Sequence, residues 1–276
     1  MKKVILITGA SSGIGKETAL YFAKNRWNVI ATMRRPEKET ELQNLENVWI
    51  TKLDVQNDDS IHVAIKAGIS HFGHIDALIN NAGYGQMGIF EATTKQQMTN
   101  QFDVNVFGVM NVIKAILPHF RERKEGMILN ISSGAGKFTL PMLSMYAASK
   151  FALEGFSEAL SFELSALNIT VKIIEPGGTQ TNFNQTTSEV FAHDASLTDY
   201  EPFVAAAGKM FNNMKQASVT SQEVAEVIYN ATTDGTDRLR YAYGNKDFRE
   251  RMNARQQMTD QEYIEFIKKG FKQYLS

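Results

Sequence analysis

The chain has 276 residues, of which 43% are hydrophobic and 21% charged, and it carries a formal net charge of −1. This composition is typical of a globular protein with a sizeable core, and we expect a single domain over residues 1–276. The near-zero net charge gives no field that would favour nucleic acid or an anionic membrane as a partner. The absence of cysteine excludes disulfides and thiolate ligands. No apolar run has the length of a signal-peptide core or a membrane span, so we expect a cytoplasmic location.

Short apolar runs alternate with longer segments of helical period along most of the chain. The runs are apolar on successive residues, as in strands that are buried on both faces. This alternation predicts the α/β class, with a Rossmann-like doubly wound parallel β-sheet and helices on both faces. In chain order, the expected elements are a strand at residues 4–8, a helix at 14–25, strands at 28–33 and 48–53, a helix at 60–72, a strand at 77–80, a helix at 95–121, a strand at 126–131, a helix at 144–167, a strand at 170–174, a helix at 221–232 and a strand at 239–243.

Two regions break this alternation. Residues 178–200 are polar and rich in threonine without a clear period, which predicts a long mobile loop that acts as a substrate lid. Residues 259–276 have the amphipathic pattern of a helix. We therefore predict a helical C-terminal extension near residues 245–276, which packs on the body of the protein or on a second subunit rather than on a membrane.

The first predicted strand is followed by a glycine-rich loop, Thr8-Gly-Ala-Ser-Ser-Gly-Ile-Gly15, that opens a helix. A helix N-terminus offers unpaired N–H groups and a partial positive charge, which suit a pyrophosphate. Gly9 can adopt the dihedral angles of a tight turn, while Gly13 and Gly15 would let phosphate and sheet approach the backbone closely. The spacing differs from the G-x-G-x-x-G fingerprint and from a P-loop, so the loop alone is equally compatible with a turn that binds nothing.

Further short motifs follow in a fixed order. They are Asn80-Asn-Ala-Gly83, Asn105, Ser133, Tyr146-x-x-x-Lys150 and Pro176-Gly177. Each is weak alone, but together with the glycine loop their order and spacing resemble the short-chain dehydrogenase/reductase family over residues 1 to about 235. The stretches NNAGYG and EPGGTQT are most similar to the branch that contains 17β-hydroxysteroid and retinol dehydrogenases. The resemblance implies an enzyme that interconverts a carbonyl and an alcohol with a nicotinamide cofactor.

The end of the second predicted strand bears on which cofactor is used. In NAD enzymes a carboxylate usually binds the adenosine ribose here, whereas an arginine accommodates the 2′-phosphate of NADP. This chain has Met33 at the position of the acid, followed by Arg34 and Arg35. A guanidinium presents a planar fork of donors that matches phosphate oxygens. We therefore expect NADP(H) to be favoured over NAD(H), with Arg34 the better candidate, although two solvated surface arginines are the alternative.

The resemblance implies further cofactor contacts from loops at the carboxyl ends of the strands. Asp54 would hydrogen-bond the adenine, although a short acid at this point could instead cap the next helix. Thr181 would contact the nicotinamide carboxamide. The complete expected set is Gly9, Ser11, Ser12, Gly13, Ile14, Gly15, Arg34, Arg35, Asp54, Val55, Asn81, Ala82, Gly83, Tyr146, Lys150, Pro176, Gly177, Thr179 and Thr181.

Four residues are the candidates for catalysis. Tyr146 and Lys150 are four apart on a predicted helix and therefore share one face. A nearby ammonium would lower the pKa of the phenol toward the working pH, so that Tyr146 could exchange a proton with the substrate oxygen. The resemblance implies that Lys150 holds the nicotinamide ribose, that Ser133 orients the reacting oxygen and that Asn105 holds a water between Lys150 and solvent. Considered singly, each could have a purely structural role.

The expected substrate site is mostly apolar. The residues taken from loops at the same sheet edge are Met87, Phe138, Leu140, Met142, Leu143, Met145 and Phe183. They favour a hydrophobic ketone, aldehyde or secondary alcohol of lipid, steroid or retinoid type, although several could instead pack the loops themselves. No convincing metal-ligand cluster exists among the five histidines.

Two other functions are less well supported. A non-catalytic NADP(H)-sensing regulatory protein on the same fold would tend to lack Tyr146 or Lys150, and this chain has both. An epimerase or dehydratase acting on a nucleotide sugar is disfavoured by the glycine spacing and the chain length. The helices near residues 103–121 and 144–167 resemble the pair that associates between subunits in the family, so a homodimer or homotetramer is expected.

Overall fold

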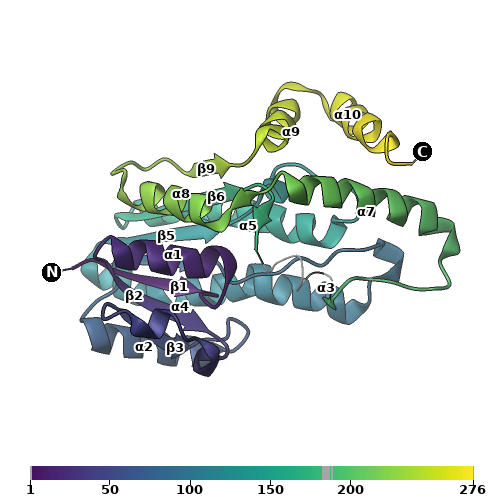
Figure 1. Ribbon diagram of the computed structural model, residues 1–276. Coiled ribbons are helices and arrows are strands. Elements are labelled where there is room, and N and C mark those ends of the chain that lie inside the picture. Colours follow the sequence, from purple (N-terminus) through teal and green to yellow (C-terminus); the bar gives the residue numbers. More distant parts are fainter. Residues whose placement is uncertain (1, 182–186, 188, 276) are drawn as a thin grey trace.

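The structure is a computed structural model that describes residues 2–181, 187 and 189–275. A seven-stranded sheet runs through its centre in the order β3-β2-β1-β4-β5-β6-β9 (Figure 1). Every neighbouring pair in it is parallel. The strands are β1 (Val4–Thr8), β2 (Asn28–Met33), β3 (Val48–Lys52), β4 (Ala77–Asn80), β5 (Gly126–Ile131), β6 (Ile169–Pro176) and β9 (Arg240–Tyr243). The predicted doubly wound α/β fold is confirmed.

Helices cover both faces of the sheet. Helices α1 (Gly13–Lys24) and α8 (Ser221–Thr233) pack on one face, where Ile5 and Ile7 of β1 belong to their hydrophobic cluster. Helices α2 (Asp58–Phe72), α4 (Gly108–Arg123) and α5 (Ser144–Ser165) pack on the other face, where Val4 and Leu6 belong to the second cluster. Successive strand residues point to opposite faces, so a strand buried on both sides must be apolar at every position.

The long helix expected at residues 95–121 is divided in the structure. Helix α3 (Lys95–Phe102) and helix α4 are joined by a π-helical turn at Asp103–Phe107. A π-turn inserts an extra residue into the helix without breaking it, and such turns are frequent at functional sites. Apolar residues continue through the turn, so the sequence gives no clear signal of the interruption.

The C-terminal third contains a helix that the sequence analysis did not predict. Helix α7 (Glu201–Gln216) follows the segment expected to be a lid, and α9 (Lys246–Gln257) and α10 (Asp260–Lys272) form the C-terminal extension. Helix α10 packs against both α7 and α9 beside the body of the protein (Figure 1). The remaining short elements are strands β7 (Thr179–Gln180) and β8 (Val219–Thr220) and the 3₁₀ turns Pro36–Lys38, Leu42–Asn44, Phe90–Ala92, Gly134–Gly136 and Thr198–Tyr200.

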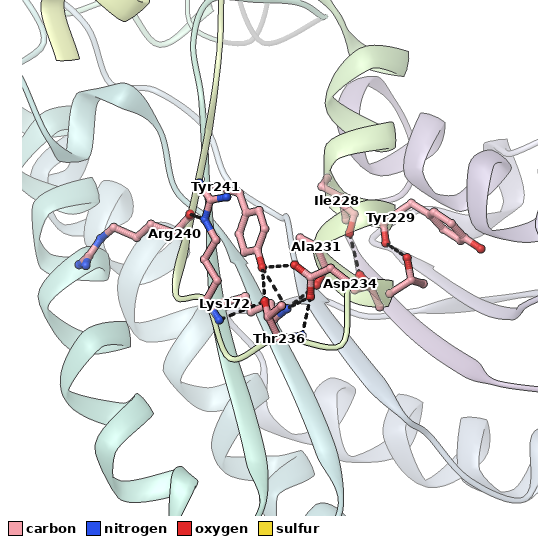
Figure 2. A network of polar contacts seen from close by, with 11 residues as sticks. Lys172, Ile228, Tyr229, Ala231, Asp234, Thr236, Arg240 and Tyr241 are labelled. Carbon is pink, nitrogen blue, oxygen red and sulfur yellow. Dashed lines mark hydrogen bonds and ion pairs between the residues drawn. The ribbon is translucent and has the colours of Figure 1, made fainter. Parts of the chain in front are cut away.

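The edge strand β9 is attached to the sheet by a buried polar network (Figure 2). Lys172 of β6 is fully buried, and its ammonium donates to the carbonyl of Ala231 at 2.7 Å, to Asp234 at 2.7 Å and to the Tyr241 hydroxyl at 3.1 Å. The Tyr241 hydroxyl also donates to the Asp234 carboxylate. One ammonium therefore joins β6, the end of α8, the following loop and β9.

Candidate active site

A cavity of about 1040 Å³ lies at the carboxyl ends of the strands. This is the edge at which open α/β sheets bind ligands. Its lining includes residues that follow five different strands: Gly9 and Ser11 to Ile14 after β1, Arg34 after β2, Asp54 after β3, Asn81 to Gly83 after β4 and Ser133 after β5. The volume is at the upper end of the range of about 300–1,000 Å³ that is typical of ligand pockets.

The glycine loop forms one end of this cavity. Gly13 has a φ of +55°, and a Cβ there would lie 3.1 Å from the Thr181 side chain, so a larger residue would fill the space between them. Ser12, at the N-cap of α1, makes no capping hydrogen bond with its side chain. The first N–H groups of α1 therefore lack a side-chain cap where the helix meets the cavity. Both features fit a bound pyrophosphate.

Gly15 does not line the cavity, unlike the other residues expected from this loop. A Cβ at Gly15 would lie 2.3 Å from the Asn81 side-chain nitrogen and 2.4 Å from the Gly9 carbonyl oxygen. The Asn81 amide donates to the carbonyls of Thr8 and Gly9 at 3.0 Å each. Gly15 thus permits the close packing through which the loop after β4 fixes the loop after β1, and a direct contact with phosphate is not its role.

The two candidate arginines are placed differently. Arg34 lines the cavity and Arg35 does not. Within the described part of the chain, the Arg34 guanidinium has no hydrogen bond or ion pair.

Asp54 and Val55 also line this end of the cavity, and Asp54 accepts a hydrogen bond from the backbone of Gln56. Helix α2 is capped by Asn57, so the alternative reading of Asp54 as a helix cap is wrong.

The structure brings Ser133, Tyr146 and Lys150 together at the middle of the cavity. The Ser133 hydroxyl hydrogen-bonds the Tyr146 phenol. Lys150, one turn further along α5, places its Nζ 5.9 Å from the centroid of the Tyr146 ring and donates to the Ile131 carbonyl at 2.8 Å. All three residues line the cavity. The hydroxyl of Tyr146 and the ammonium of Lys150 can therefore face one ligand.

The pKa values of this pair differ from the expectation. Burial raises the pKa of Tyr146 to about 12, against the smaller opposing effect of the Ser133 hydrogen bond. Burial also lowers the pKa of Lys150 to about 8, against the attraction of Glu154. The expected lowering of the Tyr146 pKa by the ammonium is thus wrong for the protein alone, because burial of the phenol dominates the shift and the opposing effect comes from the Ser133 hydrogen bond. Tyr146 is protonated at neutral pH.

Asn105 lies behind the cavity and does not line it. It is 1% exposed and sits in the π-helical turn. Its side chain accepts from the backbone N–H of Tyr84 at 3.1 Å and donates to the Tyr84 carbonyl at 2.9 Å and to Ser149 at 3.3 Å. These bonds connect the loop after β4 to α5, which carries Tyr146 and Lys150.

The remaining expected residues are distributed as follows. Pro176, Gly177, Thr179 and Thr181 line the cavity, as do Met87, Phe138, Leu140, Met142 and Leu143. Met145 does not line it, and Phe183 lies outside the described residues. Sequence reasoning missed the contributions of helices α7 and α9, among them Phe211, Phe248 and Arg251. Residues 203, 206, 207, 210, 211 and 214 have an apolar spacing that could have revealed α7.

Two buried carboxyl groups lie next to this site. Glu154 and Glu175 are 4% and 2% exposed, and Arg240 of β9 approaches them at 2.9 Å and 3.4 Å. Burial, followed by repulsion from Glu154, raises the pKa of Glu175 to about 7. The pair therefore retains a proton near neutral pH, since one guanidinium does not offset two buried charges.

Replacing Glu175 by Gln is expected to change how stability depends on pH. A carboxyl group whose pKa is higher in the folded than in the unfolded protein costs stability as pH rises from the unfolded value of about 4.3 to the folded value. The free energy of unfolding of the wild type should thus fall by about 1–3 kcal/mol between pH 5 and pH 8, and Glu175→Gln should not show this decrease. Urea unfolding at both pH values measures this. Parallel curves for the two proteins would contradict the buried proton.

Among the described residues, no group of three or more His, Asp or Glu side chains is arranged to hold a metal ion. The same part of the chain has no helix with the length and apolar character of a membrane span.

The fold and the cavity together define a Rossmann-type α/β protein with a ligand site at the carboxyl ends of its strands. A family model described as short chain dehydrogenase matches residues 3–190, and the chain belongs to this family. It is 43% identical over 216 residues to an uncharacterized oxidoreductase of Schizosaccharomyces pombe, covering 77% of this chain and 89% of the relative. It is 40% identical over 199 residues to a 3-ketodihydrosphingosine reductase of Bacteroides thetaiotaomicron (71% and 72%). It is 34% identical over 255 residues to human retinol dehydrogenase 8 (86% and 80%).

Solved structures agree with this assignment. A short-chain dehydrogenase from Streptomyces avermitilis superposes with a TM-score of 0.83 at 31% identity, covering 98% of this chain and 97% of that one. The protein ElxO, solved with NADP bound, has a TM-score of 0.72 at 29% identity, covering 88% and 98%. The first superposition covers 98% of this chain and therefore extends into its C-terminal helices.

Proposed function

We propose that this protein is an NADP(H)-dependent oxidoreductase that interconverts a ketone or aldehyde and an alcohol on an apolar substrate. The observation that carries the proposal is the hydrogen-bonded pair of Ser133 and Tyr146, with Lys150 one turn away, in a cavity that also contains the glycine loop.

The residues at the strand ends fit a nicotinamide dinucleotide. The α1 N-terminus, Gly13 and Thr181 would hold the pyrophosphate and the nicotinamide end, and Asp54 and Val55 the adenine. The Arg34 guanidinium, which has no described partner, would bind the 2′-phosphate that distinguishes NADP from NAD. The NADP complex of ElxO supports a nicotinamide dinucleotide in a related chain, and the preference for NADP rests on Arg34.

Four residues of the chain have distinct roles in the proposed reaction. When bound, the nicotinamide supplies or accepts the hydride. Tyr146, protonated at neutral pH, donates its proton to the carbonyl oxygen during reduction, and such acid catalysis contributes about 10²–10⁴-fold in rate. The Ser133 hydroxyl orients the same oxygen. Lys150, which donates to the Ile131 carbonyl, would hold the nicotinamide ribose, and Asn105 fixes the loop after β4 that borders the cavity.

Replacing Arg34 by Gln is expected to weaken NADPH binding about 10- to 100-fold, because a charge-assisted hydrogen bond contributes about 1.5–3 kcal/mol. NADH binding should change little, since it has no 2′-phosphate. Fluorescence titration with each cofactor measures both constants. Arg35→Gln is the matched comparison and should have a smaller effect, as Arg35 does not line the cavity. A wild type that prefers NADH would contradict the proposal.

Substrate class is tested by measuring NADPH oxidation with apolar ketones and aldehydes and with short polar keto acids. The apolar lining and the names of two relatives, which act on retinol and on 3-ketodihydrosphingosine, favour the first group. Preference for the short polar acids would contradict the substrate class. Tight NADPH binding without turnover of any compound would favour the non-catalytic sensor instead.

We also propose a homodimer or homotetramer formed through α4 and α5. Phe107, Phe151 and Phe162 are 52%, 42% and 72% exposed beside or on these helices. Association through these helices would remove exposed apolar side chains such as these from water. Light scattering measures the oligomeric state. The substrate lid near residues 178–200 and the cytoplasmic location stay predictions.

A further inference from the structure

Helices α7 and α9, from the C-terminal part of the chain, form one wall of the cavity. Phe248 of α9 lies against the catalytic loops: a Cβ added to Gly134 would be 2.5 Å from its ring and one added to Gly177 would be 3.0 Å from it. This close fit fixes α9 beside Ser133 and Pro176. The apolar residues of this wall and the adjoining loop include Phe138, Leu140, Met142, Leu143, Val204, Phe211 and Phe248.

Arg251 lies one turn after Phe248 and also lines the cavity. Its two arginine neighbours on α9 are engaged: Arg249 donates to the Gly244 carbonyl at 2.8 Å, and Arg255 pairs with Asp260 at 2.6 Å. Arg251 is half-buried, yet its guanidinium has no hydrogen bond or ion pair with any residue that the structure describes. A partly desolvated charge is costly when nothing compensates it, so this position suits an anionic ligand.

The charges around the cavity also favour an anionic ligand. The described lining has four basic residues, Arg34, Lys150, Lys215 and Arg251, and two acidic ones, Asp54 and Glu189. Arg34 and Asp54 belong to the adenosine end and Lys150 to the catalytic centre. Glu189 is exposed and has no ion pair with the described basic side chains. The net charge of the cavity is therefore positive, and Arg251 is the cation set among apolar side chains.

We propose that Arg251 binds a carboxylate carried by the substrate, at the end opposite its reacting carbonyl or alcohol. The substrate class is then an apolar oxo acid or hydroxy acid, whose hydrocarbon part lies along the α7 and α9 wall. The planar fork of a guanidinium matches the two oxygens of a carboxylate. This inference rests on the proposed function for the reacting end of the molecule, whereas the carboxylate contact itself does not require turnover.

Binding of unreactive probes tests the contact directly. Calorimetric titration of the NADPH-loaded protein with octanoate and with methyl octanoate should give about 10- to 100-fold tighter binding of octanoate, the range for charge-assisted hydrogen bonds. Arg251→Met should remove this preference. Arg255→Met is the matched control, since it removes an arginine of the same helix that does not line the cavity, and it should keep the preference.

A second measurement separates this inference from the proposed function. Oxo acids of graded chain length are compared with their methyl esters in NADPH oxidation, and kcat/KM should favour the acids in wild type but not in Arg251→Met. Equal binding of octanoate and its ester, or an unchanged preference in Arg251→Met, would overturn the role of Arg251. Turnover of ketones without any preference for acids would contradict the role of Arg251 and leave the oxidoreductase assignment intact. Carboxylate binding without turnover would contradict the oxidoreductase assignment and leave the role of Arg251 intact.

Discussion

Replacing Tyr146 by Phe is expected to lower kcat about 100- to 10,000-fold, the range contributed by general acid catalysis. The substitution removes one hydroxyl, which hydrogen-bonds Ser133 and whose pKa burial raises to about 12. No proton would then be available at the substrate oxygen from this side chain, while the ring and its packing remain. NADPH affinity, measured by fluorescence titration, should stay within a few-fold of wild type.

Controls decide whether the loss is catalytic. Tyr21→Phe removes a hydroxyl on the surface of α1, where it donates to Glu226 at 3.1 Å, and should leave kcat unchanged. Thermal unfolding of both variants should match wild type within a few degrees. Full activity of Tyr146→Phe would exclude this residue as the proton donor. Loss of NADPH binding in the variant would make its role structural.

The fold was predictable because its central strands are buried on both faces. The sequence analysis placed β1, β2, β4 and β5 with the bounds that the structure has, since uninterrupted apolar runs between polar turns mark such strands. Helix α7 was missed because its period follows directly on a polar segment that reads as loop. The π-helical turn at Asp103–Phe107 changes the phase of a helix without changing the type of residue.

The candidate site was predictable in its residues but not in its electrostatics. Tyr146 and Lys150 had to share a helix face at their spacing, and the structure places both at the cavity. The direction of the Tyr146 pKa shift was wrong, because the sequence does not contain the degree of burial that dominates it. Arg251 was missed for a related reason, as nothing in residues 245–276 indicates that α9 folds back onto the loops after β5 and β6.

Replacing Lys172 by Met is expected to lower the free energy of unfolding by about 2–4 kcal/mol. Met fills much of the same space, so the change removes a charge more than it opens a cavity. The variant leaves the Ala231 carbonyl, the Asp234 carboxylate and the Tyr241 hydroxyl without the ammonium that joins them (Figure 2). The lower bound allows for partial rehydration of Asp234, whose side chain is 27% exposed. Urea unfolding measures the difference.

The dependence of this loss on pH identifies its cause. Hydrogen bonds from Lys172 and Tyr241, together with the charge of Lys172, outweigh the opposing effect of burial and hold the pKa of Asp234 well below its usual range. Its stabilising contribution is therefore complete above the unfolded value of about 3.9 and is lost as pH falls below it, so the gap between wild type and Lys172→Met should narrow in acid.

Lys246→Met is the control for loss of a lysine. Its ammonium lies 3.7 Å from Glu250 on an exposed helix face, where an ion pair contributes about 0.5 kcal/mol or less. If Lys172→Met were as stable as this control, the free-energy cost of burying the ammonium would equal the stabilisation from its three hydrogen bonds. The network would then fix the register of β9 without adding stability, because a shifted β9 could not bring Tyr241 to Lys172 and Asp234 together.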